Sequence, residues 1–371
     1  MSDIADAARG VLKWAVETKF AGHDPHDLLS SPILSGIESP MARLLLLQLG
    51  RRSVLNLRTL LHVPKSENPK ALALFLMGLI RANERVSANW ATESSRLAMR
   101  LADVSLDSGG WGYPFPWQSR THFLGSNTPN IVTTSFAGMA LLEWQRLSLM
   151  PDGRVPIGRA AEYIVNRIPR LDQDGVAFGY AESDPQIVFN ASLLGAEFLV
   201  QAGRLLERTD YIELAHRAAR FVVNHQRTDG SWPYGLEPSQ HWIDSFHTGY
   251  TVLSLKTIAD VVGDDVLHDS AVQGFEYYRN NFIEPDFAVR YFPNGRYPID
   301  SHALGQAMVT LCVFGDVDTA RNVARWSCEH MRSETGYFYY QRRRLLTNRI
   351  GYMRWSNAWM FRGLCEVLSH E

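Results

Sequence analysis

The sequence has few of the features that mark secreted, membrane or nucleic-acid-binding proteins. It has three cysteines, Cys312, Cys328 and Cys365, each inside an apolar helical pattern, so buried thiols in a reducing compartment are expected. Apolar runs such as residues 72–80 are too short to span a bilayer, and residues 1–20 form an amphipathic pattern rather than a signal peptide. The formal net charge of −2 gives no overall field that would attract nucleic acid or an anionic membrane. We therefore predict a cytoplasmic protein without a transmembrane segment and with only local anion binding.

Motifs for metal ions and phosphates are also missing. The sequence has no paired-cysteine spacing and no His-Glu-x-x-His spacing. Gly109 and Gly110 neither follow a strand nor precede a P-loop lysine. The sequence therefore predicts no metal ion and no cofactor.

The chain contains a repeat of helical segments. Similar segments align at the start of a helix, and each carries a polar residue in the first turn. These residues are Thr134, Asn190, His247, His302 and Asn357. Their successive spacings of 56, 57, 55 and 55 residues fit a unit of two helices and a connecting loop.

Each unit is predicted to be a helical hairpin. Helices are expected at 88–104, 130–146, 156–168 and 187–203, and the pattern continues to 354–369. The helix at 2–19 and one of the helices at 40–62 and 69–83 form a further pair. Six pairs closing into a ring predict an all-α fold, the (α/α)6 toroid. The whole chain, 1–371, is then one domain, in which 1–83 is the least regular part and 84–371 holds five repeats.

The loops alternate in length, which predicts where the site lies. Turns from an inner to an outer helix are short, as at 314–318, and the loops that lead into inner helices are long. All long loops must lie at one end of the ring, because the inner helices run parallel, and we expect the site at that end. These loops are rich in aromatic residues, on which sugar rings or hydrocarbon chains stack. The candidate substrate-binding residues are Trp111, Tyr113, Trp117, Trp232, Tyr234, Trp242 and Tyr297, although some of them are expected only to close the core.

The five polar first-turn positions are expected to form a ring at the mouth of the toroid. Asp244, His247 and Tyr250 share one helix face, so the carboxylate can orient the imidazole while the phenol acts as a partner acid. Asp300 and His302 repeat the pairing of a carboxylate with a histidine in the next hairpin. Both aspartates equally suit helix N-caps, and both histidines suit structural hydrogen bonds.

Helix N-termini at the mouth favour an anionic substrate. Arg120 and Arg354 are candidates to bind its carboxylate, with Asn357 nearby. Such binding would stabilise the charge that develops when a proton leaves the adjacent carbon of a uronate. Toroid lyases of acidic polysaccharides use Asn, His, Tyr and Arg for this purpose, and Asn190 supplies the amide here. The run Arg342–Arg344 is expected to be a solvated rim.

Residues 217–232 resemble the QW repeat of squalene-hopene cyclases and related prenyl-chain enzymes. The matching residues are Arg217, Ala218, Phe221, Val222, Gln226, Gly230 and Trp232. In that family the motif is structural, so the resemblance implies the toroid and not the chemistry.

A broader resemblance covers most of the chain. The segments WGYPFPWQSR, FNASLLGAEFL, WIDSFHTGY and YPIDSHALGQA are similar to toroid proteins of the VpsJ type from bacterial exopolysaccharide and capsule gene clusters. The resemblance implies biosynthesis or modification of a polysaccharide, with an oligo- or polysaccharide as the substrate.

Four functions stay open at this point. We expect a lyase or C5-epimerase that abstracts a proton from a uronate-containing glycan. A glycoside hydrolase would use Asp244 and Asp300 as its two carboxylates. A terpenoid cyclase would need a strong acid, but the nearest candidate, Asp316 and Asp318, is predicted to be a helix cap. A non-catalytic glycan-binding protein would share the aromatic mouth without turnover.

Overall fold

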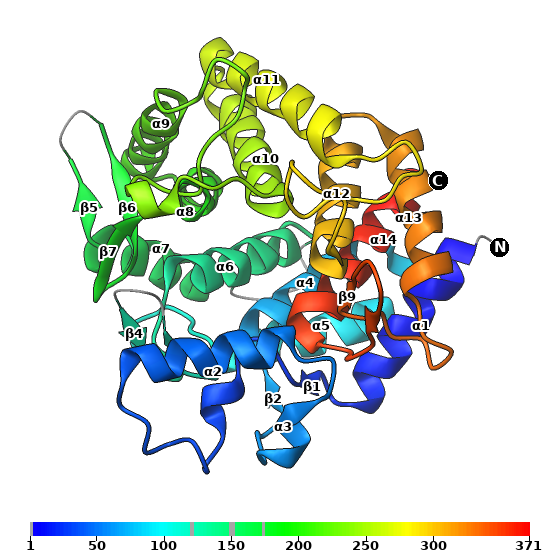
Figure 1. The fold of residues 1–371 in the computed structure, drawn as a ribbon. Helices are drawn as coiled ribbons and strands as arrows, with labels where there is room; N and C mark the ends of the chain where they lie inside the picture. Colours follow the sequence, from blue (N-terminus) through cyan, green and yellow to red (C-terminus); the bar gives the residue numbers. More distant parts are fainter. Residues whose placement is uncertain (1–2, 119–121, 148–152, 173–174) are drawn as a thin grey trace.

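The computed structural model describes residues 3–118, 122–147, 153–172 and 175–371, and helices dominate it (Figure 1). The inner helices are α4 (Pro69–Ala82), α6 (Ile131–Arg146), α8 (Phe189–Leu206), α10 (Ser245–Val262), α12 (Ser301–Val313) and α14 (Trp359–Ser369). Each packs against the next, and α14 packs against α4, so the ring is closed. The outer helices are α1 (Asp3–Glu17), α5 (Trp90–Asp103), α7 (Arg154–Arg167), α9 (Thr209–Val223), α11 (Asp265–Phe282) and α13 (Val317–Met331). The predicted (α/α)6 toroid is confirmed.

The two rings differ in burial as their sequences require. Inner helices such as α6 and α12 are buried around almost their whole circumference, whereas outer helices such as α5 and α13 bury one stripe. The inner helices α12 and α14 approach most closely at two glycines. A Cβ atom on Gly305 would lie 2.4 Å from the carbonyl oxygen of Trp359, and one on Gly363 would lie 2.4 Å from the carbonyl oxygen of Gly305. Backbone therefore packs against backbone at this contact.

The long loops contain short antiparallel strands and lie at the end of the ring where the inner helices begin. The strands are β1 (Ala21–Gly22), β2 (Ser66–Glu67), β3 (Trp117–Gln118), β4 (Phe123–Leu124), β5 (Arg170–Leu171), β6 (Ala177–Ala181), β7 (Asp184–Ile187), β8 (Ile299–Asp300), β9 (Gln341–Arg342) and β10 (Thr347–Asn348). They pair as β1-β2, β3-β4, β5-β6-β7 and β10-β9-β8. The 3₁₀ turns are Leu28–Ser30, Asn83–Arg85 and Pro238–Gln240. The predicted alternation of short turns and long loops is present.

Two long loops begin with the same turn, which shows the repeat at atomic detail. Gly109 and Gly230 have φ angles of +88° and +89°, in the region that favours glycine. Two residues later, the indole N–H of Trp111 donates to the carbonyl of Leu101 at 2.8 Å. The indole of Trp232 donates to Val222 at 2.9 Å, again ten residues back. Each tryptophan thus satisfies a carbonyl in the last turns of the preceding outer helix.

The N-terminal region and the last inner helix differ in detail from the prediction. The helix expected at 40–62 is two helices, α2 (Pro40–Arg52) and α3 (Leu57–Leu60), and neither belongs to the two rings. The expected pairing of the helix at 2–19 with the helix at 69–83 is not observed, because α1 packs against α14 and α13 while α4 packs against α5. The last inner helix begins as a π-helical segment, Met353–Ala358, before α14. Within the described ranges, no helix is both long and apolar enough to cross a membrane.

Candidate functional site

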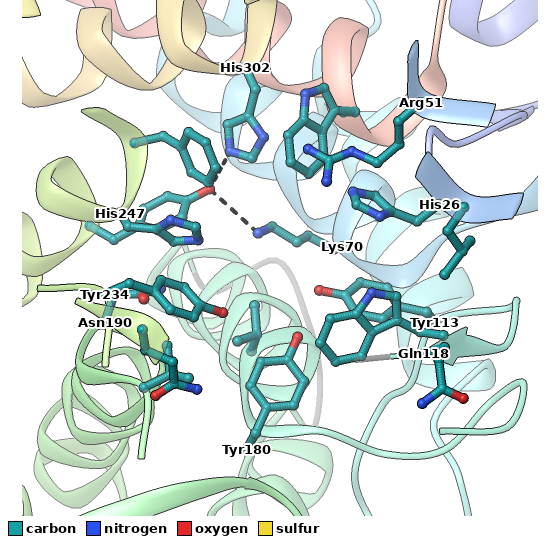
Figure 2. Close-up of a pocket in the computed structure, with 18 of the residues that line it drawn as sticks. His26, Arg51, Lys70, Tyr113, Gln118, Tyr180, Asn190, Tyr234, His247 and His302 are labelled. Carbon is teal, nitrogen blue, oxygen red and sulfur yellow. Dashed lines mark hydrogen bonds between the residues drawn. The ribbon is translucent and has the colours of Figure 1, made fainter. Parts of the chain in front are cut away.

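A cavity of about 390 Å³ lies where the inner helices begin (Figure 2). The beginning of every inner segment contributes to its wall, and α2 covers one side with Leu44, Leu47, Gln48 and Arg51. The six inner segments contribute, among others, Lys70, Val132, Asn190, His247, His302 and Arg354 in chain order. Residues separated by almost three hundred positions therefore meet in one chamber.

His247 is held by the carboxylate of Asp244. Asp244 is the N-cap of α10, and its Oδ1 accepts the backbone N–H of His247 at 2.9 Å. Its Oδ2 lies 2.7 Å from Nδ1 of the same histidine. The carboxylate thereby fixes the ring and places the proton on Nδ1. Nε2 has no hydrogen-bond partner in the described parts of the chain, so it is free to accept a proton from a bound molecule.

A second chain of hydrogen bonds joins three inner helices. The hydroxyl of Tyr250 lies 2.5 Å from Nε2 of His302 and 3.5 Å from Nζ of Lys70 (Figure 2). Nδ1 of His302 is buried and has no hydrogen-bond partner among the described residues. These contacts allow a proton to move between the phenol, the imidazole and the amine.

Burial controls the protonation of this chain. It raises the pKa of Tyr250 well above its usual value, so the phenol remains protonated. Burial, and then the positive charges of Lys70 and Arg354, hold the pKa of His302 well below its usual range, so the imidazole is neutral. Burial and Arg354 also lower the pKa of Lys70 far below that of a surface lysine. At neutral pH the site therefore combines a neutral His302 imidazole with a protonated phenol.

Aromatic rings fix the histidines in place. Phe246 lies against both imidazoles, with ring centroids 4.1 Å from His247 and 4.4 Å from His302. Trp359 also stacks on His302, with ring centroids 5.0 Å apart. Nζ of Lys70 lies 4.0 Å from the ring centroid of Phe136, a cation–π distance. These contacts limit the rotamers that the site residues can adopt.

The cavity wall is cationic. Arg51 and Arg354 are its cations, and no aspartate or glutamate lines it in the part of the chain that the structure describes. Arg354 pairs with the buried carboxylate of Asp24 through two hydrogen bonds of 2.6 and 2.8 Å. Although burial alone lowers the pKa of Arg354, Asp24 raises it above its usual value. A ligand with a negative charge would therefore be favoured in the chamber.

The opposite part of the wall is suited to a polar ring. Tyr234 and Trp242 stack with their centroids 4.3 Å apart, and Tyr113 stacks on Phe115 at 5.4 Å. Asn190 also lines this cavity (Figure 2), and its buried Oδ1 has no hydrogen-bond partner among the described residues. Stacking faces next to amide groups are what a sugar ring with several hydroxyls requires.

Nine of the predicted site residues line this cavity. They are Asn190, His247, Tyr250, His302, Tyr113, Trp117, Tyr234, Trp242 and Arg354. Asp244 and Asp300 are buried behind the wall. Trp111, Trp232, Tyr297 and Asn357 lie outside it. Arg120 lies outside the described residues.

The positions outside the cavity have structural contacts instead. Thr134 and Asn357, two members of the predicted polar ring, accept the backbone N–H groups of Trp111 and Phe338 at 3.0 and 2.7 Å. Trp111 and Trp232 satisfy outer-helix carbonyls, as described above. The expectation that these residues form part of the mouth is therefore not met, because the long loops use them as anchors.

The two aspartates have the N-cap role that was the alternative prediction. Asp300 accepts the backbone N–H of His302 at 2.8 Å and the indole N–H of Trp355 at 2.9 Å. It bonds the amide of Gln341 as well, at 2.7 Å. Asp316 also caps its helix, α13, as predicted. Only Asp244 adds a bond to an imidazole that faces the cavity.

Sequence reasoning missed several lining residues, among them His26, Arg51, Lys70, Gln118, Tyr180 and Tyr291. A signal was present for Lys70, which follows the Asn68-Pro69 helix start and precedes an apolar run. A lysine at the start of a helix that is otherwise buried requires an explanation. No comparable signal marks Arg51, because α2 lies outside the repeat. No group of three or more potential metal ligands occurs within the described ranges.

No protein-family model and no curated protein matches the chain. Among solved structures, it is similar to the cellobiose 2-epimerase from Bacillus thermoamylovorans, with 11% identity, a TM-score of 0.65, and coverage of 82% of this chain and 88% of that one. The unsaturated glucuronyl hydrolase from Bacillus sp. GL1 shares 12% identity at a TM-score of 0.64, with 100% and 96% coverage. A D-mannose isomerase shares 12% identity at a TM-score of 0.61, with 82% and 87% coverage. At these identities the likeness establishes the toroid fold.

Proposed function

We propose that this protein is a carbohydrate-active enzyme that abstracts a proton from an acidic, uronate-containing sugar. The observation that carries the proposal is the Asp244–His247 pair, whose free imidazole nitrogen faces the same chamber as the Tyr250–His302 pair. Two proton-transfer groups from successive inner helices are what a lyase or an epimerase requires.

In this mechanism the unprotonated Nε2 of His247 takes the proton from the carbon next to the carboxylate. Asp244 stabilises the imidazolium that forms. Negative charge develops on the substrate carboxylate. Arg354 is the cation available to stabilise it, and the amine of Lys70 is a further hydrogen-bond donor. Tyr250 then donates its proton, either to the leaving oxygen in elimination or to the carbon in epimerisation. After the product leaves, the proton taken up by His247 returns through solvent to the Tyr250 phenolate, which the hydrogen bond to His302 keeps in position.

The composition of the cavity wall argues against the other reactions. A hydrolase needs two carboxylates at the scissile bond, but Asp244 and Asp300 are fully buried as helix caps. A terpenoid cyclase needs a strong acid, whereas no carboxylic acid lines this chamber within the described residues. The names of the similar structures, two sugar-converting enzymes and a glucuronyl hydrolase, agree with a saccharide substrate. A role in exopolysaccharide production would provide such a substrate.

The test is proton exchange in heavy water. The protein is incubated with a panel of oligouronides and with neutral disaccharides, and products are followed by mass spectrometry, NMR and the absorbance of unsaturated uronates. Deuterium at C5 or a new double bond is expected with an oligouronide, and it should be lost in His247→Gln. If deuterium entered only C2 of a neutral reducing sugar and no oligouronide reacted, the proposal of an acidic substrate would be refuted. Binding without exchange would identify a glycan-binding protein.

A further inference from the structure

The outer side of α2 carries an apolar surface that the fold does not cover. Met41, Leu45 and Leu49 follow one another at helical spacing and are 68%, 64% and 55% exposed. The turn between β9 and β10 lies beside the end of α2, because Arg343 donates to the carbonyl of Arg52 at 2.8 Å. This turn exposes two further leucines, Leu345 at 93% and Leu346 at 45%. Together these five residues are called the α2 face.

Positive charge borders the α2 face at the end near Arg52, whereas the exposed Glu38 lies three residues before Met41 at the other end. Residues 40–65 contain five arginines or lysines and residues 339–352 contain four, and neither segment contains an aspartate or a glutamate. Arg52 and Arg344 are exposed beside the leucines. This concentration is local, since the protein as a whole has a formal net charge of −2. Exposed aliphatic side chains with a border of arginines match the acyl boundary and the headgroups of an anionic bilayer.

We propose that the α2 face docks on the surface of a membrane that contains anionic phospholipid. A second copy of the chain fits this face poorly, because a two-fold contact would bring its arginines against one another. Large, exposed aliphatic patches are uncommon on monomers and mark interaction surfaces. The inner side of the same helix, with Leu44 and Arg51, forms a wall of the cavity, so docking would place the chamber at the membrane surface.

The test is co-sedimentation of the whole protein with vesicles, and it needs no substrate. Vesicles of phosphatidylcholine alone are compared with vesicles in which one quarter of the lipid is phosphatidylglycerol, at low salt. Binding is expected only to the anionic vesicles. The variant L45S/L49S/L345S should bind at least tenfold more weakly. The affinity of R52S/R344S for the anionic vesicles should be about 25-fold lower, because each arginine near an anionic surface raises the affinity about fivefold.

Matched controls are available outside α2 and the β9-β10 turn. M99S/V155S/V266S removes three exposed apolar side chains from α5, α7 and α11, and R85S/R325S removes two exposed arginines. Both controls should bind like the wild type. The proposal would be overturned if a control variant lost as much vesicle binding as the test variants. It would also be overturned if the wild type bound the neutral vesicles as well as the anionic ones, or bound neither. It would also be overturned by a wild-type dimer that dissociates in L45S/L49S/L345S, because the face would then belong to a second copy.

Discussion

The substitution Asp24→Asn tests the buried charges that connect the N-terminal region to the last hairpin. Asp24 and Arg354 are 330 positions apart, and both are 4% exposed. The carboxylate of Asp24 accepts hydrogen bonds from Nε and Nη2 of Arg354. It also accepts one from the backbone N–H of His26 at 3.0 Å. Asparagine has nearly the same shape, so the substitution changes the charge and leaves the packing almost unaltered.

The expected cost follows from the burial of both partners. Removing one member of a buried ion pair leaves the other charge without compensation and destabilises a protein by about 3–5 kcal/mol. The neighbouring pair of Arg58 and Asp27 is itself a salt bridge of 2.5 Å, so Asp27 is already committed to another cation. We therefore expect Asp24→Asn to lower the free energy of unfolding by about 3–5 kcal/mol.

Urea denaturation followed by circular dichroism measures this difference. The double variant D24N/R354M should recover most of the loss, because replacing a buried pair with apolar groups is often neutral. Glucuronate should stabilise D24N more than the wild type, since its carboxylate can take the place of Asp24 beside Arg354. A cost below about 1 kcal/mol would refute the reasoning, because it would mean that the guanidinium does not depend on its buried counter-charge.

Three further outcomes are expected. Asp244→Asn should keep the N-cap and the stability, but it should slow proton exchange by roughly 10²–10⁴-fold in a rate assay, because His247 loses its orienting carboxylate. Burial lowers the pKa of Lys70 in the folded state, so the unfolded chain holds more protons at pH values between that pKa and 10.5. The free energy of unfolding of the wild type should therefore rise with pH across this range. Urea denaturation at several pH values should show that Lys70→Met removes the rise. Burial raises the pKa of Glu197 from 4.5 to about 7, so the folded state holds more protons in that range. Wild-type stability should therefore fall as pH rises from 4.5 to 7, by about 3 kcal/mol, and Glu197→Gln should be insensitive to pH there.

The repeat made the fold predictable. Constant spacing requires equivalent hairpins, and the alternation of loop lengths places the long loops at one end. His247 and His302 could be found because they occupy equivalent first-turn positions on successive inner helices. The position in the repeat alone could not distinguish the two histidines from Thr134 and Asn357, whose side chains accept hydrogen bonds from loop backbone. Whether a first-turn side chain faces the chamber or a loop depends on the path of that loop.

Other parts of the site depend on contacts that no local pattern encodes. Arg354 was expected to face substrate, but its partner Asp24 comes from a loop hundreds of residues away. The position of α2 over the chamber follows from packing of a segment outside the repeat. Its leucines predicted a helix correctly, yet their exposure could not be foreseen, since an amphipathic pattern normally indicates burial.

The closure of the ring has a consequence for how the chain acquires its active form. The outer helix α1 packs against α13 and α14, and the carbonyl of Asp6 accepts a bond from Arg332 at 3.1 Å. Such high contact order slows folding, because large loops must close before these contacts form. A nascent chain that still lacks the residues from Met353 onward has neither a complete chamber nor Arg354. The protein is therefore expected to gain its ligand-binding capacity only after synthesis of the last hairpin.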